Sequence, residues 1–102
     1  MRRYERKVLR KQYAFSKHAV DQSIIRDITV TELEQAITNQ SQVIEHYPED
    51  KYEPSCLILG FTSFGRPLHV QCSYASRPVV KIITLYEPDP GLWIDLRIRR
   101  TA

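Results

Sequence analysis

The sequence predicts an α+β fold in which two N-terminal helices pack on one face of a three- to four-stranded antiparallel sheet. Helix signals, namely a capping serine and a Thr-x-x-Glu capping box, come before residue 41. Three segments rich in β-branched and aromatic residues then follow between residues 55 and 87, with short loops between them. A chain of 102 residues is long enough for one compact domain with its own core.

The two helices are predicted from their starting residues. Ser16 is a suitable N-cap for a helix from about Lys17 to Arg26. Thr31 and Glu34 have the spacing of a capping box, which predicts the start of a second helix that ends near Asn39. The buried face of this second helix is predicted to contain Leu33, Ala36 and Ile37.

The strands are predicted at residues 42–47, 55–61, 66–74 and 79–87, with four-residue hairpin loops at 62–65 and 75–78. Tight closure of these loops would place Phe61 opposite Arg66 and Tyr74 opposite Val79, and strand alternation then assigns each side chain to a face. The predicted core face carries Leu57, Leu59, Phe61, Leu68, Val70, Cys72, Ile83 and Leu85. The opposite face carries Cys56, Ile58, His69, Gln71, Ser73, Ile82, Thr84 and Tyr86.

The chain offers no recognisable metal or cofactor motif. Cys56 and Cys72 are the only thiols, they lack CxxC spacing, and the predicted register places them on opposite faces of the sheet. The three histidines are scattered, and P-loop, HExxH and GxSxG patterns are absent from the sequence. We therefore expect no cofactor, no metal and no disulfide.

Charge divides the chain into three parts. The net charge is +3, but residues 1–11 hold six basic residues against one acid, and residues 97–102 hold three basic residues and no acid. We therefore expect a basic N-terminal extension at 1–12, a domain at 13–96 and a basic tail at 97–102. The tails can meet the phosphates of RNA or of a ribosome, or they can be solvated ends. Residues 54–86 contain no acid, so the predicted sheet face can also accept an anion.

The N-terminal residues lack the apolar run of a signal peptide, and no stretch is apolar enough for a membrane span. The expected location is the cytoplasm, without membrane contact. For residues 1–14 two forms stay open: Tyr4 and Val8 fit a helix turn, and residues 13–15 fit an edge strand. We expect order at 13–15 and mobility before Val8.

Several short motifs occur in a fixed order along the chain. They are Ser16-Lys17-His18-Ala19, Val43-Ile44-Glu45-His46-Tyr47-Pro48, Pro54-Ser55-Cys56-Leu57-Ile58-Leu59-Gly60, Arg66-Pro67-Leu68-His69-Val70 and Tyr86-Glu87-Pro88-Asp89, followed by Trp93. Between Phe15 and Trp93 the chain thus resembles the mostly prokaryotic family known as domain of unknown function 4258. Members of that family typically carry an arginine where this chain has Gln22, and a second one that is present here as Arg26.

The resemblance implies a fold like that of the small RelE and BrnT toxins. Such toxins are metal-independent ribonucleases or ribosome-dependent endonucleases that an antitoxin protein holds inactive. The implied function is therefore the toxin of a toxin–antitoxin pair that cleaves RNA by attack of a 2′-hydroxyl. The alternative is a catalytically silent module that binds a protein or a nucleic acid.

Five residues are candidates for the chemistry. His69 and Tyr86 can exchange protons with RNA, although a histidine in a strand can also serve only to stabilise the sheet. Arg66 can bind a phosphate or form an ion pair with Glu87, which the predicted register places opposite it. His18 and Arg26 lie on one side of the first predicted helix. The family resemblance implies that they either approach the site or fix this helix to the sheet.

Overall fold

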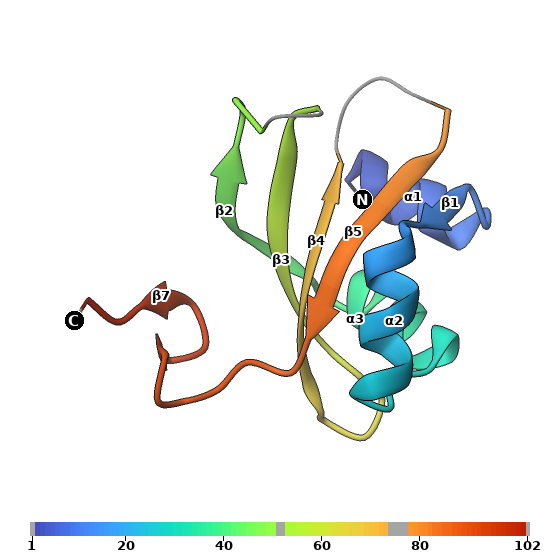
Figure 1. Ribbon diagram of the computed structural model, residues 1–102. Helices are drawn as coiled ribbons and strands as arrows, with labels where there is room; N and C mark the ends of the chain where they lie inside the picture. Colours follow the sequence, from blue (N-terminus) through green and yellow to red (C-terminus); the bar gives the residue numbers. More distant parts are fainter. Residues whose placement is uncertain (1, 51–52, 74–77, 102) are drawn as a thin grey trace.

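The computed structural model describes residues 2–50, 53–73 and 78–101 (Figure 1). In chain order the elements are α1 (Arg3–Leu9), β1 (Tyr13–Phe15), α2 (Lys17–Ile25), α3 (Val30–Thr38), β2 (Gln42–Tyr47), β3 (Ser55–Phe61), β4 (Pro67–Ser73), β5 (Val80–Tyr86), β6 (Trp93–Ile94) and β7 (Ile98–Arg99). No helix in these described ranges is long and apolar enough to cross a membrane.

The α+β prediction is confirmed, but the sheet is larger than expected. Five strands form the main sheet in the order β1-β5-β4-β3-β2, and β6 pairs with β7 in a small separate sheet. Strands β2 to β5 are antiparallel as predicted, whereas β1 pairs with β5 in parallel and makes the sheet mixed. A three-residue strand that pairs across a long stretch of sequence leaves no periodic signal, which is why its pairing was not predicted.

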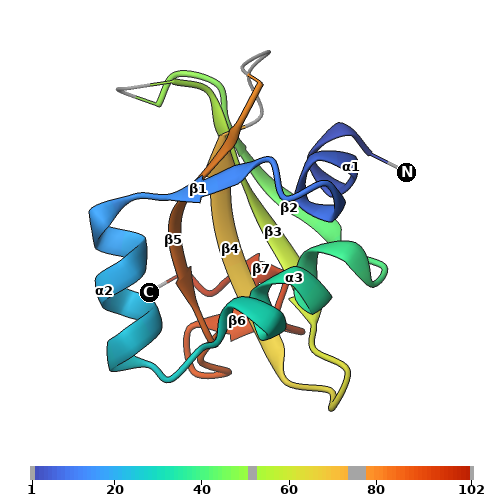
Figure 2. The same cartoon turned by 90° about the vertical axis from the view of Figure 1, so that its right-hand side faces the viewer.

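The helices lie on one side of the main sheet and the C-terminal segment lies on the other (Figures 1 and 2). We call the sheet surface under the helices the helix face and the opposite surface the open face. The segment with β6 and β7 folds back across the open face (Figure 2). The fold therefore covers both faces of the sheet, but with different kinds of structure.

Helix α2 begins as predicted, whereas α3 begins earlier. The Ser16 hydroxyl accepts a hydrogen bond from the amide of Ala19, which caps α2. The capping box of α3 consists of Thr29 and Glu32 and not of the predicted Thr31 and Glu34. Both pairs have Thr-x-x-Glu spacing, so the sequence alone did not distinguish them. Asn39 caps the C-terminus of α3, as predicted.

The hairpin between β3 and β4 has a shorter loop than predicted, and this difference inverts β3. The amide of Thr62 donates to the carbonyl of Arg66, and Gly65 adopts a positive φ of 87°. Only residues 63–65 thus form the loop, and Phe61 pairs with Pro67 and not with Arg66. A shift of one residue in register moves the side chains of a strand to the other face.

A β-bulge changes the second predicted pairing. Cys72 pairs with Ile82, one residue beyond the predicted register, and a bulge between Gln71 and Cys72 adds a second residue, so that His69 lies opposite Tyr86 and not opposite Thr84. Bulges add a residue to one strand without a strong sequence signal. Tyr74, which was predicted to pair with Val79, and most of the predicted 75–78 loop lie outside the described residues.

The face assignments were therefore correct for β4 and wrong for β3. Leu68, Val70, Cys72 and Leu85 lie in the core under the helices, as predicted. Cys56, Ile58 and Ile82 also belong to this core, although the predicted register had placed them on the opposite face. Leu57 and Leu59 are buried on the open face, Phe61 is 36% exposed, and Ile83 falls at the bulge.

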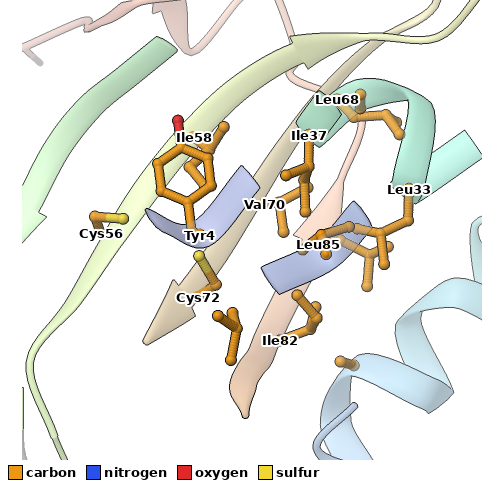
Figure 3. Packing of buried hydrophobic residues seen from close by; sticks show 14 of the residues in the cluster. Tyr4, Leu33, Ile37, Cys56, Ile58, Leu68, Val70, Cys72, Ile82 and Leu85 are labelled. Carbon is orange, nitrogen blue, oxygen red and sulfur yellow. The ribbon is translucent and has the colours of Figure 1, made fainter. Parts of the chain in front are cut away.

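The N-terminal segment contributes to the core. We expected mobility before Val8, but the structure shows a helix here, and both Tyr4 and Val8 are buried. The Tyr4 ring packs beside Cys56 and Ile58 (Figure 3). Strand β1, at the predicted residues 13–15, then pairs with β5. The basic residues before β1 are thus attached to the domain through a buried apolar anchor.

Gly60 permits the close approach of α3 to the sheet. A Cβ atom at this position would lie 1.8 Å from the carbonyl oxygen of Ala36. We predict that Gly60→Ala lowers the free energy of unfolding by about 3 kcal/mol, because backbone atoms of α3 would have to move away from β3. Urea unfolding measures this change.

Phe64→Ala is the matched control, because the Phe64 side chain is fully exposed in the neighbouring loop. This variant should unfold within about 0.5 kcal/mol of the wild type. If Gly60→Ala is as stable as Phe64→Ala, α3 does not pack on β3 in the way described.

Candidate functional site

His69 lies in the middle of β4 on the open face and is completely buried, with 0% of its surface exposed. Its Nε2 lies 2.6 Å from the carbonyl oxygen of Leu96. A carbonyl oxygen can only accept a hydrogen bond, so Nε2 carries a proton. Nδ1 is then the acceptor in the neutral ring, and the Tyr86 hydroxyl donates to it at 3.2 Å.

Aromatic rings enclose this histidine. Trp93 packs edge-on against the imidazole with a centroid distance of 4.5 Å, and Tyr86 does so at 5.2 Å. Burial lowers the pKa of His69 below its ordinary value of 6.5, although the Leu96 carbonyl partly opposes this shift. The ring is therefore neutral at pH 7, and it has no direct access to a ligand in solution. Its connection to the surface runs through the Tyr86 hydroxyl.

Tyr86 belongs to a groove beside the end of β5. The groove has a volume of about 390 Å³ and is lined by Arg26, Tyr86, Glu87, Leu92, Trp93, Arg99 and Arg100. We call it the arginine groove. Burial raises the pKa of the Tyr86 hydroxyl, which is consequently protonated at pH 7. A hydroxyl group backed by a neutral imidazole thus stands in a groove that three arginines line.

Each arginine of the groove is oriented by a hydrogen bond that its Nε–H group donates. Nε of Arg26 donates to the Gln22 side chain, that of Arg99 to the Glu45 carboxylate, and that of Arg100 to the Pro90 carbonyl. The Arg26 guanidinium also lies 5.8 Å from the centre of the Tyr86 ring, and that of Arg99 lies 4.7 Å from the centre of Trp93. Such fixed guanidinium groups are suited to bind a phosphate or a carboxylate.

The positive charge of the groove comes mainly from two of these arginines. Arg99 forms an ion pair with Glu45, and Glu87 is paired with Arg66. Within the described ranges, neither Arg26 nor Arg100 forms an ion pair. Among the described residues, the groove therefore has two arginines without an ion-pair partner, and it favours an anion with at least two negative oxygens.

Arg66 has a structural position beside the groove. Its guanidinium forms ion pairs with Glu32 and Glu87 and donates to the backbone carbonyls of Arg26 and Asp27. The ion pair between Arg66 and Glu87, which the sequence offered as the alternative to phosphate binding, is thus formed in the structure. These four bonds hold the end of α2, the start of α3 and the end of β5 together, and they fix the backbone that carries Arg26.

His18 lies elsewhere. It lines a separate pocket of about 250 Å³ together with Ser16, Asp50, Lys81 and other residues, at the start of α2. Of the five candidates from the sequence, the structure brings His69, Tyr86 and Arg26 together, whereas Arg66 lies beside them and His18 apart. Their roles in catalysis stay predictions.

The sequence reasoning missed Arg99 and Arg100 as groove residues and assigned them to a solvated or basic tail. Trp93 was expected only to cover the edge of the core. No periodic pattern links this segment to the sheet, because its position depends on long-range contacts, among them those of Leu96 with His69 and of Arg99 with Glu45. An aromatic residue followed closely by three arginines was the only local signal.

The open face itself is less positive than the acid-free segment 54–86 suggested. The Asp50 carboxylate accepts hydrogen bonds from Ser55 and Gln71, and Glu45 lies on the neighbouring strand β2. Acids from outside the segment thus reach this surface. Across the described part of the chain, His, Cys, Asp and Glu side chains form no group of three that could hold a metal ion.

A family model described as Domain of unknown function (DUF4258) matches residues 15–87, which is more than half of the chain. The chain belongs to this family. Neither a curated protein nor a solved structure matches it. The DUF4258 match includes Arg26, His69 and Tyr86 and ends before Trp93 and Arg99. The arginine groove therefore combines the matched DUF4258 region with residues that follow it.

The buried neutral histidine predicts a pH-dependent stability. Because the pKa of His69 is lower in the folded protein than the ordinary 6.5, the unfolded chain takes up a proton first as the pH falls. The contribution of His69 to the free energy of unfolding should therefore be constant above about pH 6.5 and decrease below it, by at most about 1.4 kcal/mol per pH unit. Urea unfolding at a series of pH values measures this slope.

His69→Gln should remove the slope between pH 6.5 and 4.5. Below pH 4.5 the variant should still lose stability, because Lys11 lowers the pKa of Glu34 and the Thr29 amide lowers that of Glu32. This loss of stability below pH 4.5 is the internal control. An unchanged slope above pH 4.5 in His69→Gln would show that His69 is not buried in its neutral form.

Proposed function

We propose that this DUF4258 protein binds RNA in the arginine groove and cleaves it without a metal ion, as the toxin of a toxin–antitoxin pair. One observation carries the proposal: the Tyr86 hydroxyl donates to His69 within a groove that Arg26, Arg99 and Arg100 line. This arrangement places a hydroxyl group that can exchange protons beside guanidinium groups that can bind phosphate.

Binding rests on the guanidinium groups. A phosphodiester presents two charged oxygens, and arginine can bind them through two parallel hydrogen bonds. Arg26 and Arg100 supply the charge that no carboxylate in the described residues offsets, while Arg99 lies over Trp93 and is partly neutralised by Glu45. We therefore assign the main phosphate contacts to Arg26 and Arg100.

Cleavage would use Tyr86 as the proton acceptor. As the ribose 2′-oxygen attacks the adjacent phosphorus, its proton passes to the Tyr86 oxygen, and the Tyr86 proton passes to Nδ1 of His69. The bond between phosphorus and the 5′-oxygen breaks, and this oxygen takes a proton from water. The products are a 2′,3′-cyclic phosphate and a 5′-hydroxyl. Since burial disfavours the charged imidazole, His69 then returns its proton to the Tyr86 oxygen, and the other Tyr86 proton neutralises the hydroxide that the water left behind.

The toxin assignment includes a RelE- or BrnT-like fold and an antitoxin protein as partner. It is supported by helices on one face of an antiparallel β2-β3-β4-β5 core (Figure 2) and by the arginine groove beside the end of β5. The alternative is a silent module that binds nucleic acid or protein, for which the same groove would serve without proton transfer. Activity assays on Tyr86 variants distinguish the two.

The cleavage prediction is tested with purified protein, RNA and a chelator, with and without ribosomes. The wild type should produce ends with 2′,3′-cyclic phosphate. Tyr86→Phe should reduce the rate at least about 100-fold, because the proton acceptor is lost, and leave RNA affinity within about twofold. Tyr13→Phe is the matched control, since its hydroxyl bonds to Glu34 far from the groove, and it should cleave normally.

Unchanged cleavage by Tyr86→Phe would remove Tyr86 from the mechanism. If the wild type binds RNA but cleaves none under either condition, the protein is a binding module. Expression without an antitoxin should also inhibit growth, and Tyr86→Phe should relieve this inhibition.

The binding prediction concerns charge. Arg100→Gln and Arg26→Gln should each weaken RNA binding, and each should reduce the slope of log affinity against log salt by about one unit. Arg97→Gln is the matched control, because Arg97 bonds to Asp95 and Gln42 and does not line the groove. Equal losses in all three variants would mean that the affinity comes from overall charge and not from the groove.

A further inference from the structure

Cys56 and Cys72 face each other across β3 and β4. The sequence had placed them on opposite faces, but the one-residue change in register makes them direct partners on the helix face. Both are free thiols, with 2% and 0% of their surfaces exposed. Residues directly opposite in antiparallel strands have Cα atoms about 4.5 or 5.5 Å apart, and both distances fall within the range of about 4.4 to 6.8 Å that disulfides span.

The two thiols differ in acidity. The neighbouring Cys72 thiol and the charge of Arg2 lower the pKa of the Cys56 thiol. The neighbouring Cys56 sulfur and burial raise the pKa of the Cys72 thiol. Two neighbouring thiols of unequal acidity are the arrangement in which the more acidic sulfur, as its thiolate, attacks an oxidant and the second sulfur then closes the disulfide.

We propose that Cys56 and Cys72 are a redox-active pair that a peroxide converts into a cross-strand disulfide. The Cys56 thiolate attacks one peroxide oxygen, the O–O bond breaks, and protonation of the leaving oxygen gives water and a Cys56 sulfenic acid. The Cys72 sulfur then attacks the Cys56 sulfur and displaces hydroxide, which leaves as water with the Cys72 proton. Two thiols lose two electrons in total, and hydrogen peroxide is reduced to two waters.

Helix α1 controls access to the pair. Tyr4 packs beside both cysteines in the core (Figure 3), and its hydroxyl bonds to Ser41 and receives a bond from Arg2. The helix has only seven residues, and its buried side chains are Tyr4 and Val8. Short terminal elements open at a lower free energy than the global unfolding. Oxidation therefore proceeds through release of α1 while the sheet stays folded. This redox proposal does not depend on the proposed function.

The test treats folded, reduced wild-type protein with hydrogen peroxide. Both thiols should disappear together, the mass should fall by two hydrogen atoms, and a thiol reductant should reverse the change. Chymotryptic cleavage after Phe61 and Phe64 separates the two cysteines, so the disulfide appears as a linked pair of peptides. In Cys72→Ser, Cys56 should instead accumulate as a sulfenic acid that dimedone traps.

Tyr4→Phe tests the role of α1, because it removes the bonds to Ser41 and Arg2 but keeps the buried ring. Its disulfide should form several-fold faster than that of the wild type, at unchanged circular dichroism. Phe64→Ala, in an exposed loop, should oxidise at the wild-type rate. Thiols that stay reduced in both wild type and Tyr4→Phe, or that become sulfinic acids without a linked peptide, would overturn the proposal.

Discussion

The structure depends on the hydrogen bonds of one buried imidazole. His69 stands in the central strand of the sheet, where an unpaired polar group would cost about 1 to 3 kcal/mol. Both of its nitrogens are paired, one with the Leu96 carbonyl and one with the Tyr86 hydroxyl. Burial of the imidazole on the open face thus depends on the C-terminal segment, which folds back and presents the Leu96 carbonyl to the ring. In a medium of low polarity such a network is rigid when it is complete.

The arginine groove is a consequence of this constraint. The segment that delivers Leu96 also carries Trp93 against the imidazole and positions Arg99 and Arg100 near Tyr86. On the other side of the groove, Arg66 ties the ends of α2 and β5 together and so fixes Arg26. The groove thus lies where a long-range fold-back meets the end of a helix. Neither the C-terminal segment nor the end of α2 forms the groove alone.

Local signals predicted the elements well and their pairing less well. The bounds of β2 and β3, the Ser16 cap and the buried face of α3 followed from alternation and capping. The positive φ of Gly65 shortened a loop by one residue, and this small difference moved Cys56 to the face of Cys72. A register one residue away from the prediction at Cys72, together with the bulge that follows it, placed His69 opposite Tyr86. Candidate residues within the motifs were found, whereas the positions of Arg99 and Arg100 depend on long-range contacts of the C-terminal segment that have no local pattern.

The most direct test of the account is an NMR titration with a short single-stranded RNA whose 2′-hydroxyls are methylated, so that it binds without being cleaved. The account predicts that the largest shifts occur at the Nε–H signals of Arg26 and Arg100, the indole N–H of Trp93 and the ring of Tyr86. It also predicts that the His69 Nε2–H signal persists in the complex. Shifts confined to α1 and the basic residues before β1, with the groove signals unchanged, would contradict it.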